Sequence, residues 1–161
     1  MLNWIKKFFS RLILHEGSPN KLALSFCVGN YIAFSPFIGF HGIMAFVFSW
    51  LFRLNLAVTF ATAYFVNNIW TAIPVYTADY IFGHWLVHSL FRLNVDSFTP
   101  RWMDAISLFL EQKLGLPRPC FWSFLIGGNI LGIIISIALY PGMQRLFKNL
   151  IQQKNENFST K

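Results

Sequence analysis

The stretch LALSFCVGNYIAFSPFIGFHGIMAFVFSWLF, residues 22–52, contains 31 residues and no Lys, Arg, Asp or Glu. As one straight helix it would be about 46 Å long at about 1.5 Å per residue, whereas the hydrocarbon core of a bilayer is about 30 Å thick. A single helix would need a tilt of about 50°, beyond the usual range of about 0–40°. The length therefore predicts two shorter helices joined by a break.

The sequence SPFIGFHG, residues 35–42, supplies this break. Pro36 removes a helical hydrogen bond and collides with the preceding turn, and it disfavours the helical conformation of Ser35. Gly39 and Gly42 add backbone freedom directly after the proline. We therefore expect Pro36, Gly39 and Gly42 to separate two short helices inside or across a membrane.

The composition is that of an integral membrane protein. Of the 161 residues, 55% are hydrophobic and 12% are charged, and the net charge of +7 comes mainly from basic residues that flank the apolar runs. Basic flanks set membrane topology and meet anionic headgroups, so we expect the lipid bilayer as partner and no nucleic acid. Cys27 and Cys120 have no metal-type spacing, so neither a disulfide framework nor a metal or other cofactor is expected.

Five regions follow one another along the chain. Residues 1–17 place apolar and basic side chains on opposite faces, which predicts an amphipathic helix lying in the membrane interface. Residues 18–90 form a membrane core with two interrupted apolar segments, and residues 91–118 hold a second amphipathic surface helix and a connector. Residues 119–140 predict a transmembrane helix, and residues 141–161 a polar, basic tail. The predicted fold is all-α: a polytopic membrane protein with broken or re-entrant helices and two interfacial amphipathic helices.

The second apolar run, residues 54–78, has 25 residues and is also interrupted near its centre. Paired broken segments of this kind place helix ends at the bilayer midplane in membrane transporters. Burying an amide without a partner costs several kcal/mol, so we expect the asparagines of both runs to face each other or a wet cleft. The polar or helix-breaking residues of the second run are Asn67, Asn68, Thr71 and Pro74.

Four motifs within residues 18–90 carry a resemblance to a known family. They are Ser35-Pro36-Phe37-Ile38-Gly39-Phe40-His41, Arg53-Leu54-Asn55, Asn68-Ile69-Trp70-Thr71-Ala72-Ile73-Pro74-Val75-Tyr76, and Gly83. With them the chain resembles the bacterial membrane family known as domain of unknown function 2062. Ile69 stands where the family usually has a proline, which leaves a helical path through Asn68 open. The resemblance implies a small multi-span membrane protein, in some relatives fused to glycosyltransferases, and no established activity.

Polar side chains within the two apolar runs are the candidate ligand-binding residues. His41 is the only ionisable side chain between Lys21 and Arg53, and ionisable groups inside membranes are functional candidates. Two roles are open for His41: it hydrogen-bonds the broken backbone, or it handles a proton or contacts a ligand. The full candidate set is Asn30, Ser35, His41, Asn67, Asn68 and Thr71.

Arg53 and Asp79 are the charged candidates. Asp79 pairs with Arg53 or Arg92, is simply exposed, or neutralises a cation in the pocket. His84 and His88 lie one helical turn apart, but no third ligand stands at a matching offset, so no metal site is expected.

Small residues recur four positions apart on the first and last apolar runs. Such stripes let helix backbones approach closely, either within the chain or against a second copy or another membrane partner. The residues are Ser25, Gly29 and Ala33, and Gly128, Gly132 and Ser136.

No paired carboxylates, phosphate-binding loop or nucleophile with a neighbouring base is present, so we expect no enzyme. We interpret the broken segments as a polar intramembrane site for transport or handling of a small solute or a lipid headgroup. The alternative is a non-catalytic scaffold or assembly subunit of an envelope complex. Lys6, Lys7, Arg11 and Lys21 favour the bacterial inner membrane with a cytoplasmic N-terminus, while the side of the C-terminus stays open.

Overall fold

The computed structural model describes residues 18–37, 39–87 and 121–159, together with residues 101, 108, 111, 112 and 115. These described parts of the chain contain helices and no strand, which confirms the all-α class. The predicted helix of residues 1–17 and most of the connector at 91–118 lie outside the described residues. The main helices are α2 (Pro19–Phe34), α3 (His41–Leu51), α4 (Leu56–Val66), α5 (Ile69–Trp85) and α7 (Phe121–Ser159).

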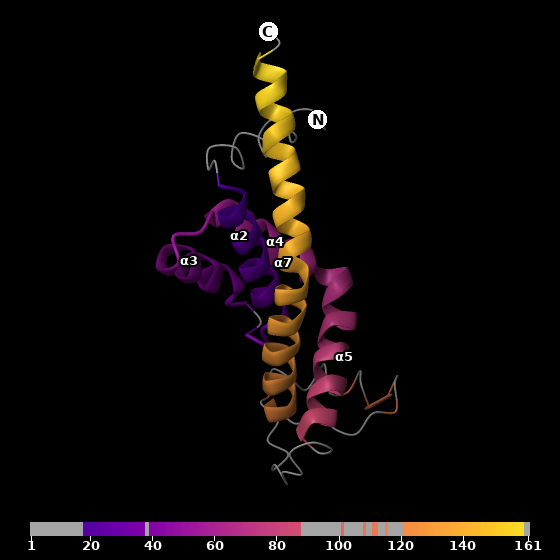
Figure 1. The fold of residues 1–161 in the computed structure, drawn as a ribbon. Helices are drawn as coiled ribbons and strands as arrows, with labels where there is room; N and C mark the ends of the chain where they lie inside the picture. The colour runs from indigo at the N-terminus through magenta and orange to yellow at the C-terminus, as the bar shows by residue number, and fades with distance from the viewer. Residues whose placement is uncertain are drawn as a thin grey trace.

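The long helix α7 is the axis of the molecule (Figure 1). Its 39 residues correspond to about 58 Å at about 1.5 Å per residue. Helix α5 lies beside its N-terminal part and α2 beside its middle, while its C-terminal part extends past both. The helix continues through Gly127, Gly128 and Pro141, so the region predicted as a separate tail begins as part of the same helix.

Of the described helices, α7 alone is long and apolar enough to cross a membrane, with a mean hydropathy of 2.0 over its best window. The bent pair formed by α4 and α5 would count as a second span if it is taken as one unit. Helix α3 is apolar but has only 11 residues. The described helices therefore supply one clear membrane-span candidate, and a polytopic arrangement is not established by their lengths.

The first apolar run turns between α2 and α3. Helix α2 ends because Ser35 is extended, with φ −70° and ψ 132°, and Pro36 follows it. Gly39 has a φ of +88°, in the left-handed region that favours glycine. Gly42, which we expected in the break, lies inside α3 instead, and a Cβ on it would meet the Tyr64 hydroxyl at 3.2 Å. Its small size therefore allows α3 to pack against α4.

The second apolar run bends at Asn67 and Asn68 and not at Pro74. Helices α4 and α5 meet there at 82°, with Asn67 ending α4 and Asn68 starting α5. Pro74 lies inside α5, which continues through it although proline cannot donate a helical hydrogen bond. The expected break at Pro74 is therefore wrong, because the two amides end one helix and begin the next six residues earlier.

Glycines allow close approach between the helices of this chain. A Cβ on Gly29 of α2 would lie 2.8 Å from the Thr62 side chain of α4, and one on Gly132 of α7 would lie 2.9 Å from the Phe34 side chain. Gly83 of α5 and Gly127 of α7 are closer still, since a Cβ on either would collide with the main chain of the other helix. These glycines, two of which belong to the small-residue stripes, thus serve contacts within the chain.

Large apolar side chains cover much of the described surface. Trp50 of α3 is 76% exposed, Phe65 of α4 is 80% exposed and Trp70 of α5 is 88% exposed. Water-soluble monomers rarely expose large contiguous apolar patches. The surface is consistent with contact to lipid.

Candidate functional site

The six predicted ligand-binding residues do not meet in one pocket. Ser35, His41 and Asn67 come together where α2 ends. The other three have separate places: Asn68 and Thr71 at the start of α5, and Asn30 between α2 and α7.

Asn67 is at the centre of the first group. Its Nδ2 donates to the carbonyl oxygen of Ala33 at 2.9 Å and to the hydroxyl of Tyr76 at 2.7 Å. His41 Nε2 lies 3.3 Å from the same nitrogen and 3.1 Å from the Ser35 carbonyl oxygen. An amide nitrogen carries two hydrogens, and the two shorter contacts use both. His41 Nε2 is therefore best placed to donate to Ser35.

These bonds satisfy backbone carbonyls at the end of a broken helix. The last four carbonyls of a helix have no partner within it, and a carbonyl buried without a partner costs several kcal/mol. Asn67 supplies a donor to Ala33, and His41 supplies one to Ser35. The position of His41 thus matches the first of its two open roles, in which the imidazole bonds the broken backbone.

Asn68 and Thr71 form a capping box at the start of α5. Asn68 Oδ1 accepts from the backbone N–H groups of Trp70 at 2.9 Å and Thr71 at 3.1 Å. Thr71 Oγ accepts from the Asn68 N–H at 3.0 Å and donates to the Val66 carbonyl at 2.6 Å. Capping supplies partners to N–H groups that the first turn leaves free. Both side chains therefore serve to start α5.

Asn30 joins α2 to α7. Its Nδ2 donates to Ser136 Oγ at 3.0 Å, and Ser136 Oγ donates to the Cys27 carbonyl at 2.9 Å. One residue further along α2, the Tyr31 hydroxyl donates to Asn129 Oδ1 at 2.6 Å. A hydrogen bond within a protein contributes about 0.5–1.5 kcal/mol net, so these bonds position α2 on α7 with a modest gain in stability.

Asp79 lies on α5 and is fully buried. Neither of its carboxyl oxygens has a hydrogen-bond partner among the described residues, and a Cβ on Gly128 would lie 3.3 Å from the carboxyl group. Arg53 is exposed in the turn after α3, with a φ of 52°. The expectations that Asp79 is exposed or pairs with Arg53 are therefore wrong, because the glycines of α7 let that helix cover the carboxyl group. Arg92 lies outside the described residues.

Across the part of the chain that the structure describes, no group of three or more His, Cys, Asp or Glu side chains could hold a metal ion. The ring of His84 lies beside that of Tyr80 on α5, with centroids 5.7 Å apart. His88, the other member of the predicted pair, is outside the described residues.

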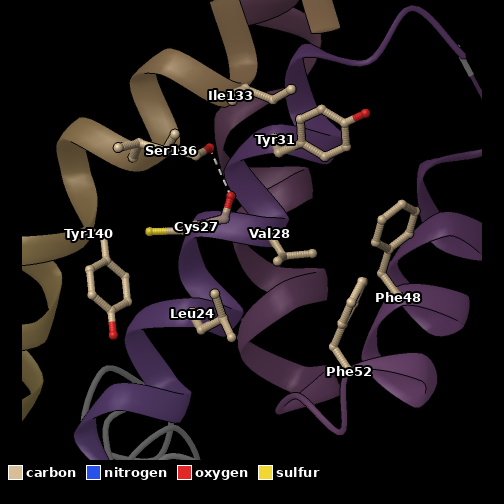
Figure 2. A pocket seen from close by; sticks show the side chains of 10 residues that line it. Leu24, Cys27, Val28, Tyr31, Phe48, Phe52, Ile133, Ser136 and Tyr140 are labelled. Carbon is tan, nitrogen blue, oxygen red and sulfur yellow. Dashed lines mark hydrogen bonds between the residues drawn. The ribbon is translucent and has the colours of Figure 1, made fainter. Parts of the chain in front are cut away.

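An apolar groove of about 360 Å³ lies between α2, α3 and α7 (Figure 2). The hydroxyl of Ser136 points to the Cys27 carbonyl rather than into the groove, so the surface presented to an occupant is almost wholly apolar. The lining residues are Leu24, Cys27, Val28, Tyr31, Phe48, Phe52, Ile133, Ser136, Ile137 and Tyr140.

The groove was not predicted from the sequence, although a signal for it exists. The four lining residues of α2 and the four of α7 follow the same spacing of i, i+3, i+4 and i+7, which is the spacing of one helix face. The two faces belong to segments about 100 residues apart in the sequence, so their pairing requires the three-dimensional structure. The two sets are Leu24, Cys27, Val28 and Tyr31, and Ile133, Ser136, Ile137 and Tyr140.

The sequence model of one protein family matches residues 2–156, which is almost the whole chain. The chain belongs to DUF2062. This family is described as an uncharacterised protein conserved in bacteria. No curated protein and no solved structure matches the chain. The DUF2062 match extends well past residues 18–90, where the motifs lie, and includes most of α7.

Two different environments therefore meet in this DUF2062 protein. The polar side chains of the two breaks bond to each other and to the backbone. The open space lies elsewhere, in a groove whose walls are apolar. Such a groove suits an alkyl chain better than a polar solute, because a polar group placed there would lose its hydrogen bonds to water.

Proposed function

We propose that this protein is an integral membrane protein of the bacterial inner membrane that binds a lipid in the groove between α2, α3 and α7. The groove is the observation that carries the proposal. In a bilayer, water would occupy an apolar groove at a cost in free energy, whereas an acyl chain fills it without losing polar contacts. The occupant we infer is therefore a lipid acyl chain.

Helix lengths support a membrane arrangement in which α2 and α3 enter from one side and return to it. Helix α2 has 16 residues, or about 24 Å, which is less than the hydrocarbon core of about 30 Å. Helix α3 turns back, so that Phe52 lies across the groove from Leu24, near the start of α2 (Figure 2). Helix α7 crosses the bilayer, and the bent α4 and α5 pair forms a second crossing.

Lipid handling is favoured over transport of a polar solute by the hydrogen bonds at the breaks. Asn67 uses both amide hydrogens within the chain, and Asn68 and Thr71 are used in capping. To bind a solute, these side chains would first have to break their hydrogen bonds within the chain. Each buried group left without a partner would cost about 1–3 kcal/mol.

The second candidate function is a non-catalytic scaffold or assembly subunit of an envelope complex. The network around Asn67 favours it, because bonds to Ala33 of α2 and Tyr76 of α5 fix the junction of three helices. A rigid junction of this kind suits a protein that presents its outer surface to a partner.

The test uses the full chain in lipid nanodiscs that contain a phospholipid with a photoreactive diazirine in one acyl chain. Labelled positions are mapped by peptide mass spectrometry. We expect labelling to concentrate on groove residues such as Val28, and Val28→Trp, which fills the groove, to abolish this enrichment. Phe46→Trp, on the exposed face of α3, is the matched control and should leave it unchanged. Uniform labelling of the groove and the outer faces would contradict lipid binding and favour the scaffold.

A further inference from the structure

Asp79 is an acidic side chain buried between helices, away from the groove. It is fully buried on α5, and neither carboxyl oxygen has a hydrogen-bond partner among the described residues. An ionised carboxylate in an apolar interior is costly unless it is paired or binds a cation. The position therefore calls for a positive charge beside the carboxyl group or for a proton on it.

The described helices packed against Asp79 bring no Lys or Arg to it. Helix α5 contains neither residue type, and α7 contains none before Arg145. A Cβ on Gly128 of α7 would lie 3.3 Å from the Asp79 carboxyl group, and Arg145 follows Gly128 by about 25 Å of helix. On α2, Lys21 lies about 20 Å before Phe34, the residue that contacts Gly128. An ion pair within these helices therefore does not neutralise the carboxyl group.

The histidines and tyrosines around Asp79 contact other groups. Tyr76 lies three residues earlier on α5, but its hydroxyl accepts from Asn67 at 2.7 Å and is beyond hydrogen-bond distance of both Asp79 oxygens. The side chains with contacts elsewhere are Tyr31, His41, Tyr76, Tyr80 and His84. None of them supplies a donor to the carboxyl group.

The carbonyl oxygen of Phe34 lies against the same glycine of α7 as Asp79. A Cβ on Gly128 would collide with this oxygen and would lie 3.3 Å from Asp79 Oδ2. Phe34 is the last residue of α2, where a carbonyl has no partner within the helix. The carbonyls on either side, in Ala33 and Ser35, each accept from a side chain of another element. No described N–H group donates to Phe34 itself. The carboxyl group and this carbonyl are thus two buried acceptors that share one place in the interface and lack a donor.

We propose that Asp79 is a proton-binding site, in which the protonated carboxyl group donates a hydrogen bond to the Phe34 carbonyl oxygen. The proton neutralises the carboxylate and supplies the donor that the two acceptors lack. It also fits the space, because α5 and α7 are in main-chain contact here: a Cβ on Gly127 would collide with the Asp79 carbonyl oxygen. Ca²⁺ or Mg²⁺ would need about six ligands, and the described residues hold no group of three acidic, His or Cys side chains.

The setting of Asp79 is one in which membrane proteins handle protons. Ionisable groups buried within membrane proteins act in proton relays, and the C-terminal ends of broken helices supply carbonyls to Na⁺ or H⁺ in transporters. Asp79 combines the two features, since it is buried beside the end of α2 at the first break. The proposal goes beyond lipid binding and does not depend on it.

Infrared spectroscopy of the full chain in lipid nanodiscs detects the proton directly, because a protonated carboxyl group has a C=O stretching band that an ionised carboxylate lacks. We expect this band in the wild-type protein at neutral pH and its loss in Asp79→Asn. Glu111→Gln, which replaces an exposed carboxyl group, is the matched control and should leave the band unchanged. Absence of the band from the wild type, or its persistence in Asp79→Asn, would overturn the proposal.

Isotope labelling assigns the band while Asp79 itself is kept. In a chain carrying Asp96→Asn and Asp104→Asn, Asp79 is the remaining aspartate. We expect the band to persist in this chain and to move to lower frequency when aspartate is labelled with ¹³C in its side-chain carboxyl group. A band that is lost in this chain, or that does not move on labelling, would show that Asp79 does not carry the proton.

Thermal unfolding separates a bound proton from a bound metal cation. The side chain of Asp79→Asn is neutral, and its amide can donate to the Phe34 carbonyl as the protonated acid does. We therefore expect this variant to keep the wild-type unfolding temperature, and the wild type to unfold at the same temperature in Na⁺ and K⁺ buffers and in a buffer with neither ion. A lower unfolding temperature of Asp79→Asn, together with stabilisation of the wild type by Na⁺ or K⁺, would assign a metal cation to the site and overturn the proton.

Discussion

The two breaks in the apolar core of this protein are built differently. Between α2 and α3 the chain turns at Pro36 and Gly39, a proline and a glycine with positive φ. Between α4 and α5 it bends at Asn67 and Asn68 without either residue type. The two breaks are joined, because Asn67 donates to the Ala33 carbonyl at the end of α2.

The comparison shows where a helix can end inside an apolar core. It ends where side chains form hydrogen bonds with the backbone N–H and C=O groups that have no partner within the helix. At the first break, Asn67 and His41 supply donors to carbonyls of α2 and its C-cap. At the second, Asn68 and Thr71 cap the new helix. Pro74 starts no break, because a proline removes one hydrogen bond without supplying partners for a full helix end.

The largest effect should come from Asn67, on which both breaks depend. We expect Asn67→Ala to lower the free energy of unfolding by about 3 kcal/mol, because it removes two hydrogen bonds and leaves the Ala33 carbonyl without a donor. Equilibrium unfolding in mixed detergent micelles measures the change. Asn20→Ala, which removes an exposed amide bond to Gln144, is the control and should cost less than about 1 kcal/mol. Equal costs for the two variants would show that Asn67 does not join the breaks.

Gly39 tests the first break alone. A Cβ on Gly39 would meet nothing within 4 Å, so Gly39→Ala changes only the backbone preference. The left-handed conformation should cost about 1–2 kcal/mol. Gly142 of α7 also has open space around it but carries no positive φ, and Gly142→Ala should stabilise the protein by about 0.5–1 kcal/mol. Thermal unfolding of both variants in detergent measures the two effects. A shift of the unfolding temperature in the same direction for both variants would contradict a turn that depends on the positive φ of Gly39.

Asn68 tests the second break alone. Asn68→Ala removes the cap of α5 and should cost about 1 kcal/mol. Asn68→Ser keeps an accepting oxygen without adding a charge, and both variants lose the Asn68 Nδ2 donor to the Phe65 carbonyl, so Asn68→Ser should cost less than Asn68→Ala. The same unfolding measurement applies. If both substitutions cost equally, capping by Oδ1 is not what starts α5.

Pro74 should give the smallest effect. Because α5 already runs through this position, Pro74→Ala restores a backbone donor and should not reduce stability. The angle between α4 and α5 should also stay near its present value, which spin-label distances between positions on the two helices can measure. A straightened α4–α5 pair, or a clear loss of stability, in Pro74→Ala would show that the proline causes the second break.

The first break could be predicted because its cause is local. The steric demands of Pro36 and the length of residues 22–52 are both readable from the sequence. The meeting of His41 and Asn67 follows less directly: a buried polar side chain needs a partner, but the sequence does not say which. The sequence therefore predicts Asn30 in the same site as His41 and Asn67. In the structure Asn30 instead bonds Ser136 of α7, a residue 106 positions away.

The burial of Asp79 and the groove could not be predicted for a related reason. Gly127 and Gly128 cover Asp79 only because α7 packs on α5, and the groove requires faces of α2 and α7 to meet. Both depend on tertiary pairing of distant segments, which hydrophobic spacing within one segment does not specify.

The return of α2 and α3 to one side of the membrane, which we propose, is tested most directly by two-sided labelling. Single cysteines at positions 20, 53 and 122, in a chain whose Cys27 and Cys120 are replaced, are treated with a membrane-impermeant maleimide in intact and in inverted membrane vesicles. We expect positions 20 and 53 to react from the same side and position 122 from the opposite side. Reaction of positions 20 and 53 from opposite sides would mean that the segment crosses the bilayer, and it would contradict the groove arrangement proposed for this protein.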